Sequence, residues 1–440
     1  MNFFKKITFL FLFLFINKLG SVTNLSFNVK TPSEHEKIKC LSLILKNKTN
    51  DDEILTKLGK TLKYDLEFTD QMEINLKKSK KRLTKELEEK FFNNDVSLCL
   101  YISNIEKNKT KIELKNLGSG SIEFEKEFKI NTKNLIQSAH RISDELLPKL
   151  TGEESMCKYC LAYCKMISNT QKNIVLSDYS CNFEKTLISE KLINVAPSWH
   201  TKTSTIFYSQ FTKNKINLMS YNLKNNKNSI ICSYDGLNMQ PSFSNDGSKA
   251  ALCMSGGKNS EIYLFDSKIS KKLKQRVFKK LTNNGGNNVS PYLLENDDVI
   301  FCSDFQTGQP QIYYLNRKEN YTYRLTNGKG YCAAPSYCAK NNNVVYTRPV
   351  NGTFQLFTLN LDNFDNLQEK QITFNGGNKH EPDYSPCGRF IVFSYDFEYK
   401  KGYQTQQIAV LNVNSGKIRV LTQSKAPKSF PKWSKTPIIT

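Results

Sequence analysis

Residues that could carry out catalysis are scarce in this chain. It has only four histidines, His35, His140, His200 and His380. None belongs to an H-E-x-x-H metal-binding pair, and no G-x-G-x-x-G, Walker A or G-x-S-x-G sequence occurs. A lone histidine is more often structural than catalytic. These residues therefore indicate no catalytic centre and no cofactor site.

The cysteines offer a second possible chemistry. Cys157, Cys160, Cys164 and Cys181 lie close together in the sequence, but their spacing matches no strong zinc pattern. In an oxidising compartment Cys157, Cys160 or Cys181 could form a disulfide, and Cys332 with Cys338 is another local option. We favour small unpaired core residues over a disulfide, and either of these over a metal site.

A repeat in the second part of the chain supplies the scaffold. Six prolines recur at steps of 44 to 50 residues, each followed within two positions by an aromatic residue: Pro197, Pro241, Pro291, Pro335, Pro382 and Pro431. Each repeat contains short runs of apolar and β-branched residues, and one of them ends in Leu-Thr or Ile-Thr, as at Leu281-Thr282 and Ile372-Thr373. A period in the forties with four strands per repeat is typical of a β-propeller, one blade per repeat.

The end of the chain predicts how the propeller closes. Thr440 follows the sixth proline after only one strand, whereas the missing strands lie upstream, near Cys157. The last strand should therefore complete a blade begun there, which leaves no open sheet edge. We predict six blades over residues 157–440. Cys164, Cys253 and Cys302 occupy the slot that Ser or Thr fills in other repeats, which supports a core role.

The first part of the chain predicts an exported protein with a small α/β domain. Residues 1–21 have a short positive start and an apolar stretch of secretory length, so we predict a signal peptide. Residues 22–37 are polar and indicate a flexible arm. Residues 38–152 predict strands and three helices, with Asp51 and Thr132 as helix caps, a hairpin turn at Gly118-Ser119-Gly120, and Gly152 at the end. The fold class is thus α+β with two domains.

The chain is unusually basic. Its net charge is +22 and its pI is about 9.3, values that suit either an anionic partner or an evenly solvated surface. The lysines are spread along the sequence without an evident basic face, so we favour the solvated surface and expect no nucleic-acid partner. No later apolar run is long enough to cross a membrane, so we expect no stable membrane insertion.

Several stretches resemble the TolB family. Ser138-Ala139-His140-Arg141-Ile142-Ser143-Asp144-Glu145, followed by Leu150-Thr151-Gly152, is similar to the end of the TolB N-terminal domain. Pro241-Ser242-Phe243-Ser244-Asn245-Asp246-Gly247 is close to the P-x-W-S-P-D-G repeat of that family. Gly308-Gln309-Pro310-Gln311 resembles its most distinctive blade hairpin. The resemblance covers nearly the whole chain, in the family's order.

This resemblance implies a non-enzymatic, monomeric, periplasmic hub of the Tol-Pal system. The propeller mouth would bind the peptidoglycan-associated lipoprotein, and the arm before Lys37 would bind TolA, in support of outer-membrane integrity and of constriction at cell division. Outer-membrane lipoproteins or peptidoglycan are further implied partners. The matching mouth positions are Leu237, Gln240, Val289 and Ser290. Two alternatives remain: a propeller that binds cell-wall glycan directly, and a propeller-linked hydrolase relative, which the missing nucleophile sequence disfavours.

Overall fold

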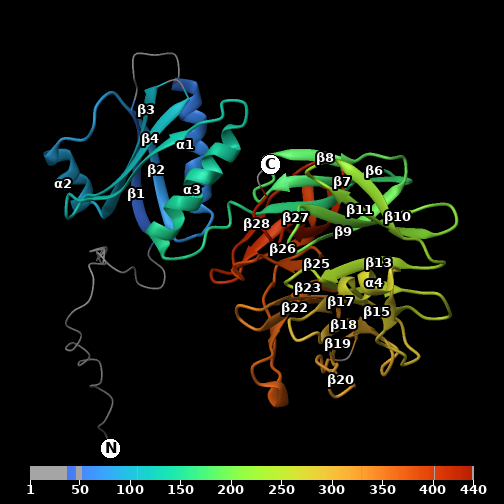
Figure 1. The fold of residues 1–440 in the computed structure, drawn as a ribbon. Helices are drawn as coiled ribbons and strands as arrows, with labels where there is room; N and C mark the ends of the chain where they lie inside the picture. The colour runs from blue at the N-terminus through green and yellow to red at the C-terminus, as the bar shows by residue number, and fades with distance from the viewer. Residues whose placement is uncertain (1–36, 46–51, 107, 329, 401, 439–440) are drawn as a thin grey trace, which may run out of the picture.

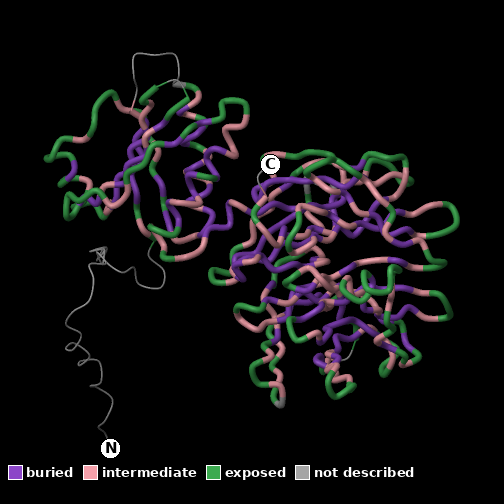
Figure 2. The backbone as a smooth tube through the Cα atoms, viewed as in Figure 1, coloured by how far each residue is buried: buried purple, intermediate pink, exposed green. Residues whose placement is uncertain are grey.

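The computed structural model describes residues 37–45, 52–106, 108–328, 330–400 and 402–438 (Figure 1). The expected signal peptide, nearly all of the arm and the expected cap Asp51 lie outside these residues. Figure 1 shows an α/β region followed by a β-propeller. Buried residues run along the strands of both parts, whereas exposed residues gather at the turns (Figure 2).

The α/β region is built on one five-stranded sheet with the order β2-β1-β3-β4-β5. β1 is parallel to β2 and β3, and β3, β4 and β5 are antiparallel. The strands are β1 (Ile38–Leu45), β2 (Met72–Ser79), β3 (Val96–Glu106), β4 (Lys109–Asn116) and β5 (Ile122–Lys129). The helices are α1 (Asp52–Glu67), α2 (Lys85–Asn93) and α3 (Leu135–Thr151).

The side chains of the central strand β1 alternate between two hydrophobic cores, one on each face of the sheet. Cys40 and Ile44 of β1 join the core formed with α1 and α3, whereas Leu41 and Leu43 pack with Phe91 of α2 on the other face. Successive side chains of a strand point to opposite faces, so a strand covered on both sides is apolar throughout. The run of buried residues in β1 therefore reflects its central place in the sheet.

Some of the predicted helix ends and turns of the α/β region are confirmed and one is wrong. Gly152 ends α3 in a left-handed conformation, and the turn from Gly118 to Gly120 joins β4 to β5, as predicted. The prediction of Thr132 as a cap is wrong, because α3 begins at Leu135 and the Asn134 side chain accepts the Gln137 N–H instead. β2 was not predicted, since this edge strand alternates with polar residues and ends in lysines.

The propeller consists of antiparallel sheets arranged around a centre. Four of them are separate four-stranded sheets with the orders β13-β14-β15-β16, β17-β18-β19-β20, β21-β22-β23-β24 and β25-β26-β27-β28. The fifth is an eight-stranded sheet in which the path β12-β11-β10-β9-β7-β6-β29 carries β8 beside β7. Within it the last strand, β29, pairs with β6, with Lys428 opposite Lys165.

The strand bounds follow the predicted repeats closely. In the first sheet they are β6 (Cys160–Ser168), β7 (Gln171–Asp178), β8 (Glu184–Ile188), β9 (Ile193–Trp199), β10 (Thr205–Phe211), β11 (Ile216–Asn222), β12 (Lys227–Cys232) and β29 (Lys428–Trp433). The next two sheets contain β13 (Asn238–Phe243), β14 (Lys249–Met254), β15 (Glu261–Asp266), β16 (Phe278–Lys280), β17 (Asn288–Leu293), β18 (Val299–Ser303), β19 (Gln311–Asn316) and β20 (Tyr321–Arg324). The last two contain β21 (Ala333–Cys338), β22 (Asn343–Val350), β23 (Thr353–Asn360), β24 (Glu369–Gln371), β25 (Lys379–Tyr384), β26 (Phe390–Lys400), β27 (Tyr403–Asn412) and β28 (Ile418–Val420). Two short helices, α4 (Ser267–Leu273) and η1 (Phe364–Asn366), were not predicted.

The residue before every repeat proline has a positive φ. The six residues, with φ between 52° and 55°, are Ala196, Gln240, Ser290, Ala334, Glu381 and Phe430. At each of them the pairing of the innermost strand with its neighbour shifts register. A non-glycine residue adopts this conformation only when its surroundings impose it. The repeated proline therefore marks a β-bulge in each innermost strand.

The Leu/Ile-Thr pairs close the blades through a repeated hydrogen-bond pattern. The Thr373 hydroxyl accepts the Leu356 N–H at 2.9 Å and donates to the Gln355 side chain at 2.7 Å. Thr326 makes the same two contacts with Ile312 and Gln311. In each case the threonine hydroxyl accepts a buried backbone N–H and also holds the side-chain amide of the glutamine near the start of the blade's third strand.

The cysteine slot is also explained by the fold. The thiols of Cys253 and Cys302 donate to the carbonyl oxygens of Asn288 and Cys332 at 3.5 Å, and Thr347 makes the equivalent contact with Lys379 at 2.6 Å. All twelve cysteines lie in the described part of the chain and are free thiols, and all except Cys181 are buried.

Replacing Thr373 with valine should lower the free energy of unfolding by about 1–3 kcal/mol, because the buried Leu356 N–H loses its acceptor while the side-chain shape is kept. The measurement is urea unfolding followed by tryptophan fluorescence. Thr358→Val in the same strand β23 is the matched control, since Thr358 is half-buried and makes no such bond. Equal effects of the two substitutions would contradict the assigned role.

Candidate functional site

The six bulges surround a central cavity of about 630 Å³. The residue before every repeat proline lines it, as do four of the six prolines, and the aromatic residues Trp199, Phe243, Tyr292, Tyr337 and Trp433 lie beside them. Because the bulge turns each innermost strand at the same level, one residue from every repeat reaches the cavity. The cavity is therefore a direct product of the repeat.

Three of the four predicted site residues line this cavity. Gln240, Val289 and Ser290 belong to its walls, whereas Leu237 does not. The Ser290 hydroxyl donates to the Gln240 side-chain oxygen at 3.2 Å, which joins two neighbouring innermost strands. Leu237 is half-buried and packs on the core that contains Ala251 and Phe301. The structure thus brings Gln240 and Ser290 together and places Leu237 behind the cavity wall.

A cluster of charges lies on the opposite wall of the cavity. The buried Asp383 carboxylate accepts the Trp433 N–H at 2.9 Å and the Ser336 hydroxyl at 3.2 Å, and it forms ion pairs with Lys432 at 3.2 Å and Lys435 at 3.7 Å. Burial raises the pKa of Asp383, but the two lysines and these donors outweigh it, so the pKa lies below its usual value. Asp383 of β25 therefore remains ionised and connects its strand to β29 through the bond to Trp433.

The cavity lining mixes apolar groups with a smaller share of polar and charged ones. None of the described residues that line it is a histidine, and the lining thiol of Cys302 has a pKa raised to about 12 by burial. A thiol with that pKa is a poor nucleophile near neutral pH. The arrangement of amide, hydroxyl, lysine and aromatic groups is instead suited to binding the surface of another molecule.

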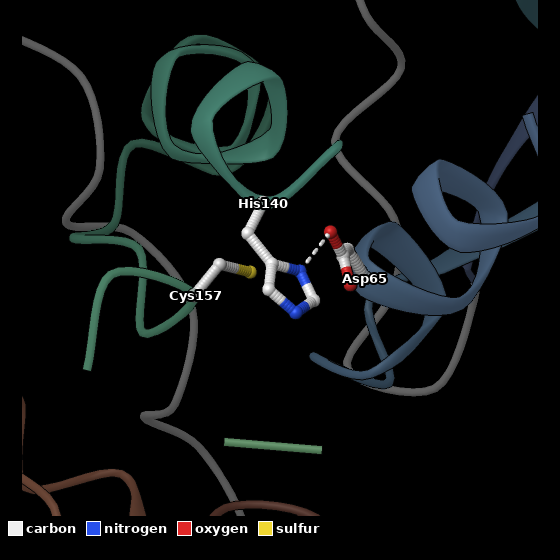
Figure 3. Close-up of side chains that lie close together, drawn as sticks. All are labelled: Asp65, His140 and Cys157. Carbon is white, nitrogen blue, oxygen red and sulfur yellow. Dashed lines mark hydrogen bonds and ion pairs between the residues drawn. The ribbon is translucent and has the colours of Figure 1, made fainter. Parts of the chain in front are cut away.

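A second cluster of chemically capable residues lies where the α/β region meets the propeller (Figure 3). His140 of α3 is held between two carboxylates, with Nδ1 at 2.9 Å from Asp65 of α1 and Nε2 at 3.0 Å from Asp178 of β7. Asp65 also accepts the hydroxyls of Ser143 and Tyr179, both at 2.6 Å. All five side chains are buried, so the network joins the two parts of the chain inside the protein.

The donor set of this cluster favours a cationic histidine over a metal site. Burial alone lowers the pKa of His140, but the facing Asp65 and Asp178 carboxylates outweigh it and raise the pKa to about 10. Asp65, His140 and Cys157 each place one ligand atom within 4.8 Å of the others. A protonated imidazole has no free lone pair, and burial keeps the Cys157 thiol protonated by raising its pKa. Both ring nitrogens of His140 face carboxylates, so the geometry favours ion pairing of His140 with Asp65 and Asp178 over coordination of a metal ion.

The sequence identified His140 as structural but not its partners. Asp65 lies 75 positions away and carries no pattern that would connect it to His140. Asp178 and Tyr179 end a predicted strand, so only the folded arrangement reveals that they face α3.

Aromatic and ionic contacts extend the same interface. The Phe68 ring lies 5.0 Å from Tyr179 and 5.4 Å from Phe390, and the Arg419 guanidinium lies 4.9 Å above it. Arg419 also forms an ion pair with Asp70. A single hydrophobic cluster runs from the α/β region into the propeller. The two parts are therefore packed against each other rather than only tethered.

The His140 network predicts that stability falls as the pH rises from 7 to 8. The folded pKa is about 10 and the unfolded value about 6.5, so the folded state holds a proton that the unfolded state releases across this range. The free energy of unfolding should fall by up to about 1.4 kcal/mol per pH unit. Urea unfolding of the unaltered protein at both pH values measures it.

His140→Gln should reduce this pH dependence, and the part that remains should come from the buried cysteines, because burial raises the pKa of thiols such as Cys157 and Cys302 and keeps them protonated in the folded state. His200→Gln should preserve it, because burial lowers the pKa of His200 and leaves that side chain neutral in this range. A free energy of unfolding that is constant from pH 7 to 8 in the unaltered protein would show that His140 is not held as a cation.

In the described part of the chain, no helix is both long and apolar enough to span a membrane.

Comparisons of the sequence with known proteins point to one family. The chain is similar to the Tol-Pal system protein TolB of Helicobacter pylori, with 27% identity over 356 residues, covering 78% of this chain and 82% of the relative. It is 26% identical to the Tol-Pal system protein TolB of Francisella tularensis subsp. mediasiatica over 322 residues, covering 68% and 71% of the two chains.

The solved structure of TolB from Acinetobacter baumannii has a similar fold. The match has a TM-score of 0.75 at 18% identity and covers 91% of this chain and 97% of that one. The sequence model of the TolB beta propeller domain matches residues 147–437. Since this match spans most of the chain and coincides with the propeller, the chain belongs to the TolB beta propeller family.

Proposed function

We propose that this chain is a periplasmic, non-enzymatic component of a Tol-Pal system that acts as a hub for protein partners. The observation that carries this proposal is the family match over residues 147–437, together with relatives named as Tol-Pal system proteins along most of their length. The cavity supports a binding role, because amide, hydroxyl, lysine and aromatic groups line it. Export would depend on residues 1–21, and the protein would act as a monomer.

We also infer that the propeller has six blades and is closed by its last strand. The eight-stranded sheet divides into two four-stranded units, β9–β12 and β29 with β6–β8. As paired strands these units are joined by a single bridge, between Lys172 of β7 and Ile193 of β9. Four further sheets of four strands complete the ring. The domains would then be residues 38–152 and 157–440, after a signal peptide at 1–21 and an arm at 22–37.

The partner surface in this proposal is the cavity rim around Gln240, Val289 and Ser290, where the peptidoglycan-associated lipoprotein would bind. Leu237 would support the loop from behind rather than touch the partner, since it packs on the core. The arm before Lys37 would bind TolA, and outer-membrane lipoproteins or peptidoglycan would be secondary partners. The role would be to maintain the outer membrane and draw it inward at division.

Calorimetry with the periplasmic domain of the host's peptidoglycan-associated lipoprotein tests this proposal. We expect saturable binding by the chain from Val22 and by the chain from Lys37, in moderate salt that screens the general positive charge. Binding by both would support a site on the propeller. Binding by neither, combined with retention on purified peptidoglycan, would favour the direct glycan-binding alternative.

The double substitution Gln240→Ala with Ser290→Ala should weaken this binding about five- to tenfold, because both side chains and the bond between them are removed from the rim. Gln368→Ala is the matched control, since Gln368 is exposed on the loop after η1, outside the cavity lining. Unchanged affinity in the double variant would remove these two residues from the partner surface.

A further inference from the structure

The segment from Ser267 to Lys280 concentrates positive charge on one part of the propeller. It has seven lysines and arginines and no acidic residue. It comprises α4, the turn after it and β16, and most of its side chains are exposed. The interpretation of the charge as evenly spread is therefore wrong for this segment, which we call the α4 segment.

Most of this charge is not neutralised by the protein. Within the described part of the chain, Lys280 pairs with Glu261 at 3.0 Å, and the Arg276 guanidinium donates to the Ile231 carbonyl of β12. The remaining five lysines form no ion pair among the described residues: Lys268, Lys271, Lys272, Lys274 and Lys279. Their ammonium groups are available to an external anion.

Apolar side chains accompany these lysines at the surface. Ile269 and Leu273 are one helical turn apart on α4 and are 49% and 53% exposed. The backbone N–H groups of Lys268 and Ile269 donate to the Asp266 side chain, which caps the helix, and the buried Ser270 accepts the Val277 N–H. The helix is thus fixed to the blade with an apolar pair left outside.

The neighbouring sheet adds to this apolar surface. Arg276 reaches the backbone of β12, where Ile230 is 55% exposed, and the Tyr234 ring, which is 52% exposed, lies 5.9 Å from Phe278. A contiguous exposed apolar patch marks a site of interaction, and these exposed residues beside unpaired lysines are a candidate for one.

We propose that the α4 segment binds the surface of a bilayer that contains anionic phospholipid. Lysine is a hydrated point charge on a flexible stem, which suits a fluid layer of headgroups better than it suits fixed bidentate recognition. Ile269 and Leu273 can enter the boundary between headgroups and acyl chains, as the apolar faces of interfacial helices do. A soluble anionic polymer would use the lysines but gain nothing from these two residues. This inference does not depend on the proposed Tol-Pal partners.

Co-sedimentation with vesicles tests the proposal on the full mature chain. The protein should bind vesicles of phosphatidylglycerol and phosphatidylcholine, should not bind phosphatidylcholine alone, and should dissociate at high salt. Lys268→Gln with Lys271→Gln and Lys272→Gln should weaken binding by at least about tenfold, since the substitutions remove three unpaired positive charges that attract the anionic surface. Ile269→Ser with Leu273→Ser should also weaken it.

The matched control is Lys185→Gln with Lys191→Gln and Lys213→Gln. It removes the same charge from exposed propeller lysines that form no ion pair among the described residues. An equal loss in this control would show diffuse attraction and overturn the site. Absent binding to the mixed vesicles would also overturn it. Equal binding to soluble polyglutamate with no effect of the serine variants would assign the segment to polymers instead. Thermal unfolding of each variant verifies that the fold is kept.

Discussion

A left-handed residue before each repeat proline is the constraint around which the propeller is arranged. Each of these six bulges interrupts pairing within a blade and frees the next residues to contact the neighbouring sheet. The Ser242 hydroxyl accepts the Leu293 N–H at 2.9 Å, Ser336 accepts the Tyr384 N–H at 3.2 Å, and Asp383 accepts the Trp433 N–H. The strained position and the bond across sheets therefore belong to one repeated unit, and the cavity is the space that these units enclose.

A different kind of interaction holds the α/β region in place. Buried ions are costly unless they are paired and hydrogen-bonded, and the cluster around His140 meets that condition with one cation between two carboxylates and three hydroxyls. Such networks require accurate geometry, which here comes from Phe68 and Arg419 at the edge of the same interface. The apolar contacts provide area, and the polar cluster selects one orientation.

Repeated features of this structure were predictable from sequence, and single features were not. The prolines, the Leu/Ile-Thr pairs and the cysteine slot recur at equivalent positions, so each copy supports the interpretation of the others. Asn134 and Thr132 are both good helix caps, and only the packing of α3 decides between them. Gln240 and Ser290 line the cavity because they precede prolines, whereas Leu237 lies behind the wall because its burial depends on the core beneath its loop. Their part in binding a partner stays a prediction. The pairing of Asp65 with His140 and the position of α4 depend on contacts between distant segments.

The pairing of β29 with β6 also determines when this protein can finish folding. The Cys160 N–H donates to the Ser434 hydroxyl across 274 positions, so the first propeller strand meets its partner only when nearly the whole chain is present. Closing so long a loop is slow, because its entropy is lost before the contact is formed. A chain that is synthesised or translocated from its N-terminus would carry β6 with one unpaired edge throughout that time. The free thiols of Cys160 and Cys164 lie in β6. Before β29 arrives, the open edge of β6 can pair with a wrong strand and these thiols can be oxidised, so early folding is the stage at which such errors are most damaging.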